Sequence, residues 1–111
     1  MKIEPDKSIE VWLNEEWDLS LDWDQGNIDK LTKHMTNMEL VESIFDEKFI
    51  FGGRIVWKDE TIHSENRYIL YGKQRDGRGM ALIWTIRRKQ IRPISCRRLR
   101  QNELKILEGS I

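Results

Sequence analysis

The stretch RYILYGKQRDGRGMALIWTIRRKQIRPISC, residues 67–96, contains the pattern that decides the fold. Three strand-like runs alternate in it with two polar turns, the first of which carries an Asp-Gly pair. Strands are expected at 67–73, 80–86 and 91–96, and the turns between them at 74–79 and 87–90. The run 80–86 is apolar throughout, as in a central strand covered on both faces. Pro93 has no N–H to donate, so we expect it at a sheet edge, a strand end or a bulge.

Upstream of this meander the sequence predicts more β structure and two helices. Residues 49–51 and 54–57 flank Gly52-Gly53, a dipeptide typical of a two-residue hairpin turn, and residues 21–23 alternate apolar with polar. Apolar residues at three- and four-residue spacing predict these two helices over 25–34 and 36–46, and a third helix over 98–108, after the meander. The expected caps are Asp24, a capping box of Thr36 and Glu39, and Gly109 after the last helix.

These elements define an α+β fold class. We expect two N-terminal helices and a C-terminal helix to pack on one face of an antiparallel sheet of about four to five strands. The chain has 111 residues, which is the size of one domain. Residues 1–20 are acidic and are interpreted as an N-terminal extension, in which only residues 9–13 predict a short strand. Residues 21–111 form the main domain.

Charge is distributed unevenly along the chain. Residues 1–66 contain 7 Lys and Arg against 16 Asp and Glu, a balance of −9, and residues 67–111 contain 12 against 3, a balance of +9. Nine of those twelve cations are Arg, whose planar fork binds phosphate bidentately. Either the two halves neutralise each other, or the basic half meets a polyanion such as nucleic acid. An Arg-rich, solvated sheet edge is the plainer alternative.

The chain lacks the motifs of several enzyme classes. It has no phosphate-binding glycine loop, no Ser-His-Asp spacing and no pair of zinc ligands, so we expect no metal and no other cofactor. Its one Cys, Cys96, excludes a disulfide framework and is expected to be a small buried hydrophobe. The sequence shows no membrane-length apolar run and no leader pattern, so we expect an intracellular, cytoplasmic protein.

Three ionisable residues stand out by their positions. His34 ends a predicted helix, where the helix dipole favours a cation. His63 lies in a polar loop near Glu60 and Glu65, and taken alone it fits an ordinary surface histidine. Glu103 falls near the centre of the apolar stripe of the last predicted helix, where a carboxylate needs a partner. The preceding strand offers Arg92, Arg97 and Arg98. We therefore interpret Glu103 as half of a structural ion pair rather than as a catalytic group.

A set of short motifs runs through most of the chain. In order they are Trp23-Asp24, Lys33-His34, Phe45-Asp46, His63-Ser64-Glu65-Asn66-Arg67-Tyr68, Gly72, Gly77-Arg78, Arg92-Pro93-Ile94-Ser95-Cys96-Arg97-Arg98 and Glu103. Together they resemble the BrnT family, which comprises ribonuclease toxins of bacterial type II toxin–antitoxin pairs. The resemblance covers about residues 21–107, and its most specific parts are Trp-Asp, Lys-His and the Arg-x-Ile-Ser-x-Arg strand ending.

The resemblance implies a RelE-like fold and cleavage of RNA without a metal ion. It also implies a small antitoxin encoded beside the toxin and dimerised through its own DNA-binding portion, so that the complex binds operator DNA. Five residues match polar positions of the family motif: His63, Arg67, Arg78, Arg92 and Arg97. The chain departs from the family pattern where Asn66 replaces the usual Glu, Met35 a Gly and Cys96 an Ala, and it lacks the Pro that often follows Phe-x-Asp.

These expectations together define a site. Cleavage of RNA by its own 2′-OH needs a base, an acid and cations at the phosphorane. We expect the catalytic group to be His63, Glu65 and Arg67, with Glu60 or Glu65 assisting the histidine as base. We expect the RNA-binding cations to be Arg78, Arg92, Arg97 and Arg98. Because Arg is a poor acid, Tyr68 and Tyr71 are the first residues to inspect as proton donors.

Two other functions fit the same residues. Asn66 and the N-terminal extension favour a catalytically inactive relative that acts as a protein- or nucleic-acid-binding module. The opposite charges of the two halves fit a self-restrained toxin, in which the acidic half shields the basic half. A short neighbouring reading frame with a ribbon-helix-helix pattern would favour the active toxin with an antitoxin partner.

Overall fold

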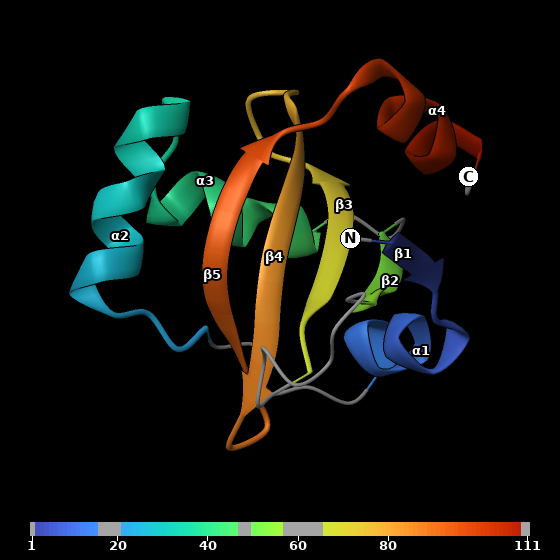
Figure 1. Ribbon diagram of the computed structural model, residues 1–111. Coiled ribbons are helices and arrows are strands. Elements are labelled where there is room, and N and C mark those ends of the chain that lie inside the picture. The colour runs from blue at the N-terminus through green and yellow to red at the C-terminus, as the bar shows by residue number, and fades with distance from the viewer. Residues whose placement is uncertain (1, 16–20, 47–49, 57–65, 110–111) are drawn as a thin grey trace.

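The computed structural model describes residues 2–15, 21–46, 50–56 and 66–109. It contains a five-stranded antiparallel sheet in which strands adjacent in the chain are adjacent in the sheet (Figure 1). The strands are β1 Lys2–Pro5, β2 Phe51–Val56, β3 Tyr68–Lys73, β4 Gly79–Arg87 and β5 Gln90–Arg98. The helices are α1 Lys7–Glu15, α2 Gln25–Leu31, α3 Met38–Ser43 and α4 Gln101–Gly109, with 3-10 turns η1 Thr32–His34 and η2 Ile44–Asp46. The predicted α+β class is confirmed.

Helices cover both faces of the sheet, and the expectation of a single helical layer is wrong. Side chains alternate along each strand, so Leu70 and Trp84 point to a core shared with α1, α2 and α3. On the same two strands, Tyr71 of β3 and Ala81 of β4 point the other way, to a second core that includes Leu107 of α4. The last helix therefore packs on the opposite face, because β3 and β4 are apolar on both sides.

Residues 2–15 are part of the same structure. Residues 9–13 lie in helix α1 and not in the expected strand, because Ile9, Trp12 and Leu13 recur at helical spacing. The Asp6 carboxylate accepts a hydrogen bond from the Ile9 N–H (3.2 Å) at the start of this helix. Trp12 stacks on Trp84 with ring centroids 5.7 Å apart, and β1 pairs with β2. The division of the chain at residue 20 into extension and domain stays a prediction.

The Gly52-Gly53 pair lies inside strand β2 and does not form the expected hairpin turn. A Cβ on Gly52 would lie 3.2 Å from atoms of Glu10 and Leu13 in α1. A Cβ on Gly53 would lie 3.0 Å from the Glu4 carbonyl oxygen in β1. The two glycines therefore serve the close approach of the N-terminal helix and strand to β2.

Cap residues fix the helices that flank the candidate site. Asp24 caps α2, as predicted, and accepts a hydrogen bond from the Asn27 N–H (2.7 Å). Asn37, and not Thr36, caps α3 by accepting from the Leu40 N–H (2.9 Å). The Thr36 hydroxyl donates instead to Gln74 Oε1 (2.5 Å) after β3.

The edge strand β5 is longer than predicted. It extends to Arg98, opposite Met80, so α4 begins at Gln101 and not at residue 98. Pro93 lies in this edge strand opposite Trp84, next to a register shift, which confirms its predicted placement. Leu21 forms a parallel bridge to Ile91 at the same edge. No helix among the described residues is long and apolar enough to cross a membrane.

Candidate active site

Arg67 is the one residue of the predicted catalytic group that the described structure includes. His63 and Glu65 fall in residues 57–65, which lie outside the described residues. The backbone at Arg67 is held beside β2, because its carbonyl accepts a hydrogen bond from the Ile55 N–H (2.9 Å). On the other side, the Thr85 hydroxyl donates to the Asn66 carbonyl (2.8 Å). Arg67 thus lies at the start of β3, at the end of the sheet where the β4–β5 turn also lies.

The Arg67 side chain is half-buried and incompletely satisfied. Its Nε is buried and has no hydrogen-bond partner among the described residues. A buried donor without an acceptor costs about 1–3 kcal/mol of stability. Arg67 also forms no ion pair with the described residues, so its positive charge is not neutralised by a described carboxylate.

Arg92 is already occupied by two carboxylates. It donates to Asp22 Oδ2 (3.2 Å) and makes a short ion pair with Asp24. The Asn27 amide donates to the Pro93 carbonyl (2.5 Å), so polar contacts fasten the start of α2 to β5. Because two carboxylates surround one guanidinium, the surroundings of Arg92 carry no net positive charge.

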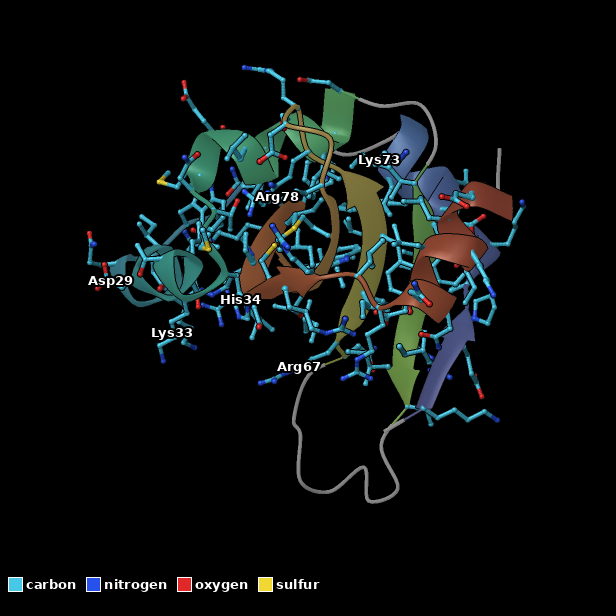
Figure 2. All side chains as sticks on the ribbon, turned by 90° about the horizontal axis from the view of Figure 1, so that it is seen from above. Asp29, Lys33, His34, Arg67, Lys73 and Arg78 are labelled. Atoms are coloured by element: carbon cyan, nitrogen blue, oxygen red, sulfur yellow. The ribbon has the colours of Figure 1, made fainter. Side chains whose placement is uncertain are left out.

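Arg78 holds the connection between α2 and α3. Its Nε donates to Asp76 Oδ2 (2.8 Å), and its NH2 donates to the Met35 carbonyl (2.7 Å). Met35 has a φ of 54°, in the left-handed region, and this contact helps to fix it there. Figure 2 shows the Arg78 and Arg67 side chains well apart. Arg67 directly precedes β3, whereas Arg78 lies beyond the other end of that strand, in the turn to β4.

Glu103 and Arg97 form a bidentate ion pair between α4 and β5. The Arg97 guanidinium donates to both Glu103 oxygens, at 2.7 and 2.9 Å. The Arg100 N–H (2.9 Å) and the Tyr71 hydroxyl (3.0 Å) also donate to this carboxylate, which is only 4% exposed. The hydrogen bonds from Arg97, ahead of those from Arg100 and Tyr71, lower the pKa of Glu103 to about 2.

Of the two tyrosines that we singled out, Tyr71 has its hydroxyl engaged by Glu103. Burial, together with the hydrogen bond to Glu103, raises the pKa of Tyr71 to about 12. Tyr68 packs on Trp84 with ring centroids 4.9 Å apart, on the face shared with α1. Burial likewise raises the pKa of the Cys96 thiol to about 12, and the predicted buried cysteine is confirmed.

The predicted cations do not converge on one point. Arg92 lies opposite Thr85 near the β4–β5 turn, whereas Arg97 lies opposite Ala81 near the β3–β4 turn. Four residues of strand separate these two positions on β4, which is about 13 Å. Arg78 and the exposed Arg98 belong to the second group. The structure thus places Arg67 and Arg92 at one end of the sheet, and the other three at the opposite end.

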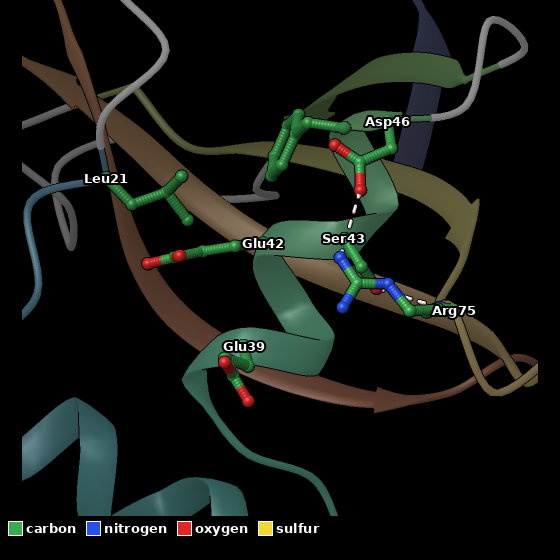
Figure 3. Close-up of a pocket in the computed structure, with 7 residues that line it drawn as sticks. Leu21, Glu39, Glu42, Ser43, Asp46 and Arg75 are labelled. Atoms are coloured by element: carbon green, nitrogen blue, oxygen red, sulfur yellow. Dashed lines mark hydrogen bonds and ion pairs between the residues drawn. The ribbon is translucent and has the colours of Figure 1, made fainter.

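A hollow of about 360 Å³ lies beside α3 and η2 (Figure 3). It is lined by Leu21, Glu39, Glu42, Ser43, Phe45, Asp46 and Arg75. The Arg75 guanidinium is paired with Asp46 (3.4 Å), so two further carboxylates are left uncompensated among the lining residues. This charge would repel phosphate, and the hollow is therefore a poor candidate for an RNA site.

The comparison with known families agrees with the motifs that the sequence displays. Residues 23–103 match the family described as ribonuclease toxin, BrnT, of type II toxin–antitoxin system. The match runs from the segment before α2 into α4 and places the chain in the class of type II ribonuclease toxins. Within that class, the chain belongs to the BrnT family, which implies a protein antitoxin as partner. A comparison with curated proteins finds no match. The RelE-like label stays a prediction with which the architecture is compatible.

Proposed function

We propose that this chain is a toxin that cleaves cellular RNA in the cytoplasm without a metal ion. A DNA-binding antitoxin encoded beside it would neutralise it. The observation that supports RNA chemistry at this site is the half-buried Arg67 guanidinium, whose Nε lacks an acceptor among the described residues. Arg78, Arg92 and Arg97 already have carboxylate or carbonyl partners. A phosphate that contacts the exposed part of the Arg67 guanidinium would meet a cation that has no carboxylate partner among the described residues.

In the proposed reaction, the 2′-OH of a ribose attacks the adjacent phosphorus. His63, assisted by Glu65, takes the hydroxyl proton, and the Arg67 fork stabilises the added charge on the phosphorane. The P–O5′ bond then breaks, and the proton that His63 took from the 2′-OH is returned, directly or through a water molecule, to the leaving 5′ oxygen, which leaves a 2′,3′-cyclic phosphate and a 5′-OH end. Arg78, Arg92, Arg97 and Arg98 stay predicted RNA contacts, and Arg98 is the most exposed of them.

Purified protein tests this proposal directly. Total RNA incubated with excess EDTA should be cut into fragments that carry 5′-OH ends, and added antitoxin should stop the cutting. Cleavage that requires added Mg²⁺ would overturn the metal-independent mechanism. RNA binding without any cleavage would replace this proposal with the inactive binding module.

Expression in cells tests the partner. Induction of the chain alone should arrest growth and degrade RNA, and co-expression of the neighbouring gene should restore both. Arrest that persists with the neighbouring gene would contradict neutralisation by that product. RNA that stays intact during arrest would contradict the proposed target.

A further inference from the structure

The turn between β4 and β5 combines an unfavourable backbone conformation with a cluster of cations. Arg87 pairs with Gln90, and the two residues between them, Arg88 and Lys89, have φ values of 53° and 65°. Asn-Gly or Asp-Gly is the usual sequence of a two-residue hairpin turn with two positive φ values, because a larger side chain is strained there. Among the described non-glycine residues, only Met35 shares this conformation.

The cations of this turn have no acidic partners among the residues that the structure describes. Arg87, Arg88 and Lys89 are all exposed. Within the described part of the chain, no ion pair or side-chain hydrogen bond engages any of the three. Three adjacent positive charges therefore project into solvent from the end of the β4–β5 hairpin.

The turn lies at the same end of the sheet as Arg67. Thr85, two residues before Arg87, holds the Asn66 carbonyl by its hydroxyl. β3 and β4 are in register there, with Tyr68 opposite Trp84. In Figure 1 the turn is the lowest point of the β4–β5 hairpin, and β3 begins at the same end. A polyanion held at Arg67 would thus have close by three exposed cations that form no ion pair with any described residue.

We propose that Arg87, Arg88 and Lys89 form a second phosphate-binding element, which holds the RNA backbone beyond the phosphate at Arg67. This inference rests on the proposed function in that RNA is the ligand of this end of the sheet. Arg forks match phosphate oxygens in geometry, and exposed cations without partners lose little on binding them. A turn that keeps two cations where Asn-Gly would be less strained is expected when the charges serve binding.

Replacing the turn residues by Asn-Gly, the least strained sequence, distinguishes a role in RNA binding from a role in stability. In the double variant Arg88→Asn, Lys89→Gly, we expect an equal or higher Tm, because the strain is relieved. Binding is measured on single-stranded RNA of mixed sequence with 2′-O-methyl groups, which prevent cleavage. Loss of two phosphate contacts should reduce the slope of log K against log salt by about 1.4, and weaken binding on the order of tenfold at 0.1 M salt.

Two further variants serve as matched controls. Lys73→Gln with Lys105→Gln removes two exposed charges away from the turn and should leave the slope unchanged. Arg88→Lys with Lys89→Arg keeps both charges in the turn and should also keep the slope. An unchanged slope in the Asn-Gly variant, or weaker antitoxin binding with unchanged RNA binding, would overturn the inference. RNA cleavage by the parent protein tests the proposed function separately, since a parent that binds RNA through this turn without cutting it would leave the inference standing.

Discussion

The Arg67 guanidinium is the residue-scale feature on which the proposed chemistry depends. Removing a preorganised charge at a transition state lowers a rate on the order of 100-fold or more, so we expect this loss from Arg67→Ala. His63→Ala should abolish cleavage similarly, because it removes the proposed base. Arg67→Lys should rescue poorly, since an ammonium keeps the charge but loses the fork. The measurement is the cleavage rate of purified variants, alongside growth arrest on induction.

Arg75→Ala is the matched control for these substitutions. Arg75 is exposed and pairs with the exposed Asp46, so its removal should alter neither Tm nor cleavage by much. All variants should keep the parent Tm within a few degrees and still bind antitoxin. If both alanine variants remain as active as the parent, the site lies elsewhere, and Arg78, Arg92 and Arg97 become the next candidates.

Glu103 gives a prediction of stability against pH. Its pKa of about 2 in the fold lies below its ordinary value of 4.5, so the ionised form stabilises the native state. This contribution is present above about pH 4.5 and is lost as the pH falls toward 2. Glu103→Gln should therefore be destabilised by about 3 kcal/mol at pH 7, since Arg97 loses its ionic partner. Urea unfolding should show this difference from the parent shrinking between pH 5 and about pH 3.

Glu108→Gln, on the exposed side of the same helix, controls for the loss of one charge from α4. It should unfold like the parent at both pH values. A Glu103→Gln variant with normal stability but no RNA cleavage would contradict the structural role of Glu103 and make it catalytic.

At the scale of the elements, local patterns predicted what local forces determine. The three strands over 67–96 and the helix capped by Asp24 follow from alternation, turn residues and capping. Gly52-Gly53 did not follow, because its role is set by α1, whose Glu10 and Leu13 lie some forty residues earlier in the chain. The helical spacing of Ile9, Trp12 and Leu13 was visible in the sequence and was the signal for α1.

Gly72 in β3 allows η2 to pack directly on the sheet. A Cβ at this position would overlap Ile44 Cγ2. Because the interior there has no free space, Gly72→Ala should cost about 1–3 kcal/mol, measured by urea unfolding. Ile44→Leu removes the branch methyl, so the double variant should be more stable than the sum of the two single losses. Strict additivity would contradict this contact as the cause.

The N-terminal helix α1 gives a second prediction at this scale. Trp12 stacks on the fully buried Trp84, so Trp12→Ala should lower stability by about 3 kcal/mol through lost packing. The Tm should fall while RNA cleavage at a lower temperature is retained, because Tyr68 points to the face that α1 covers and the preceding residue, Arg67, therefore points to the other face. Val11→Ala, on the exposed side of the helix, is the control. Faster cleavage in Trp12→Ala would instead favour the self-restrained toxin.

At the scale of the whole molecule, the uneven charge of the chain has a partly internal explanation. Arg92 pairs with Asp22 and Asp24, and Arg75 pairs with Asp46, so acidic and basic halves do neutralise each other in places. Such pairs join residues up to 70 positions apart, which is why no local pattern showed which cations were occupied. The resemblance singled out Arg67, but only the three-dimensional contacts distinguish it from Arg92.

The cations that are not paired internally should make the affinity for RNA depend steeply on salt concentration. Arg67, Arg98 and the three cations of the β4–β5 turn are the cations for which we expect phosphate contacts, and each contact releases about 0.7 of a counterion from single-stranded RNA. Five contacts would give a slope of about −3.5 for log K against log salt. The Tm should change little over the same range, because the partly exposed ion pairs contribute little and are screened. The measurement is RNA binding by anisotropy from about 50 to 200 mM salt, with thermal unfolding in parallel. An RNA affinity that does not change with salt concentration would contradict binding of a polyanion by the basic half, since phosphate contacts of cations always release counterions.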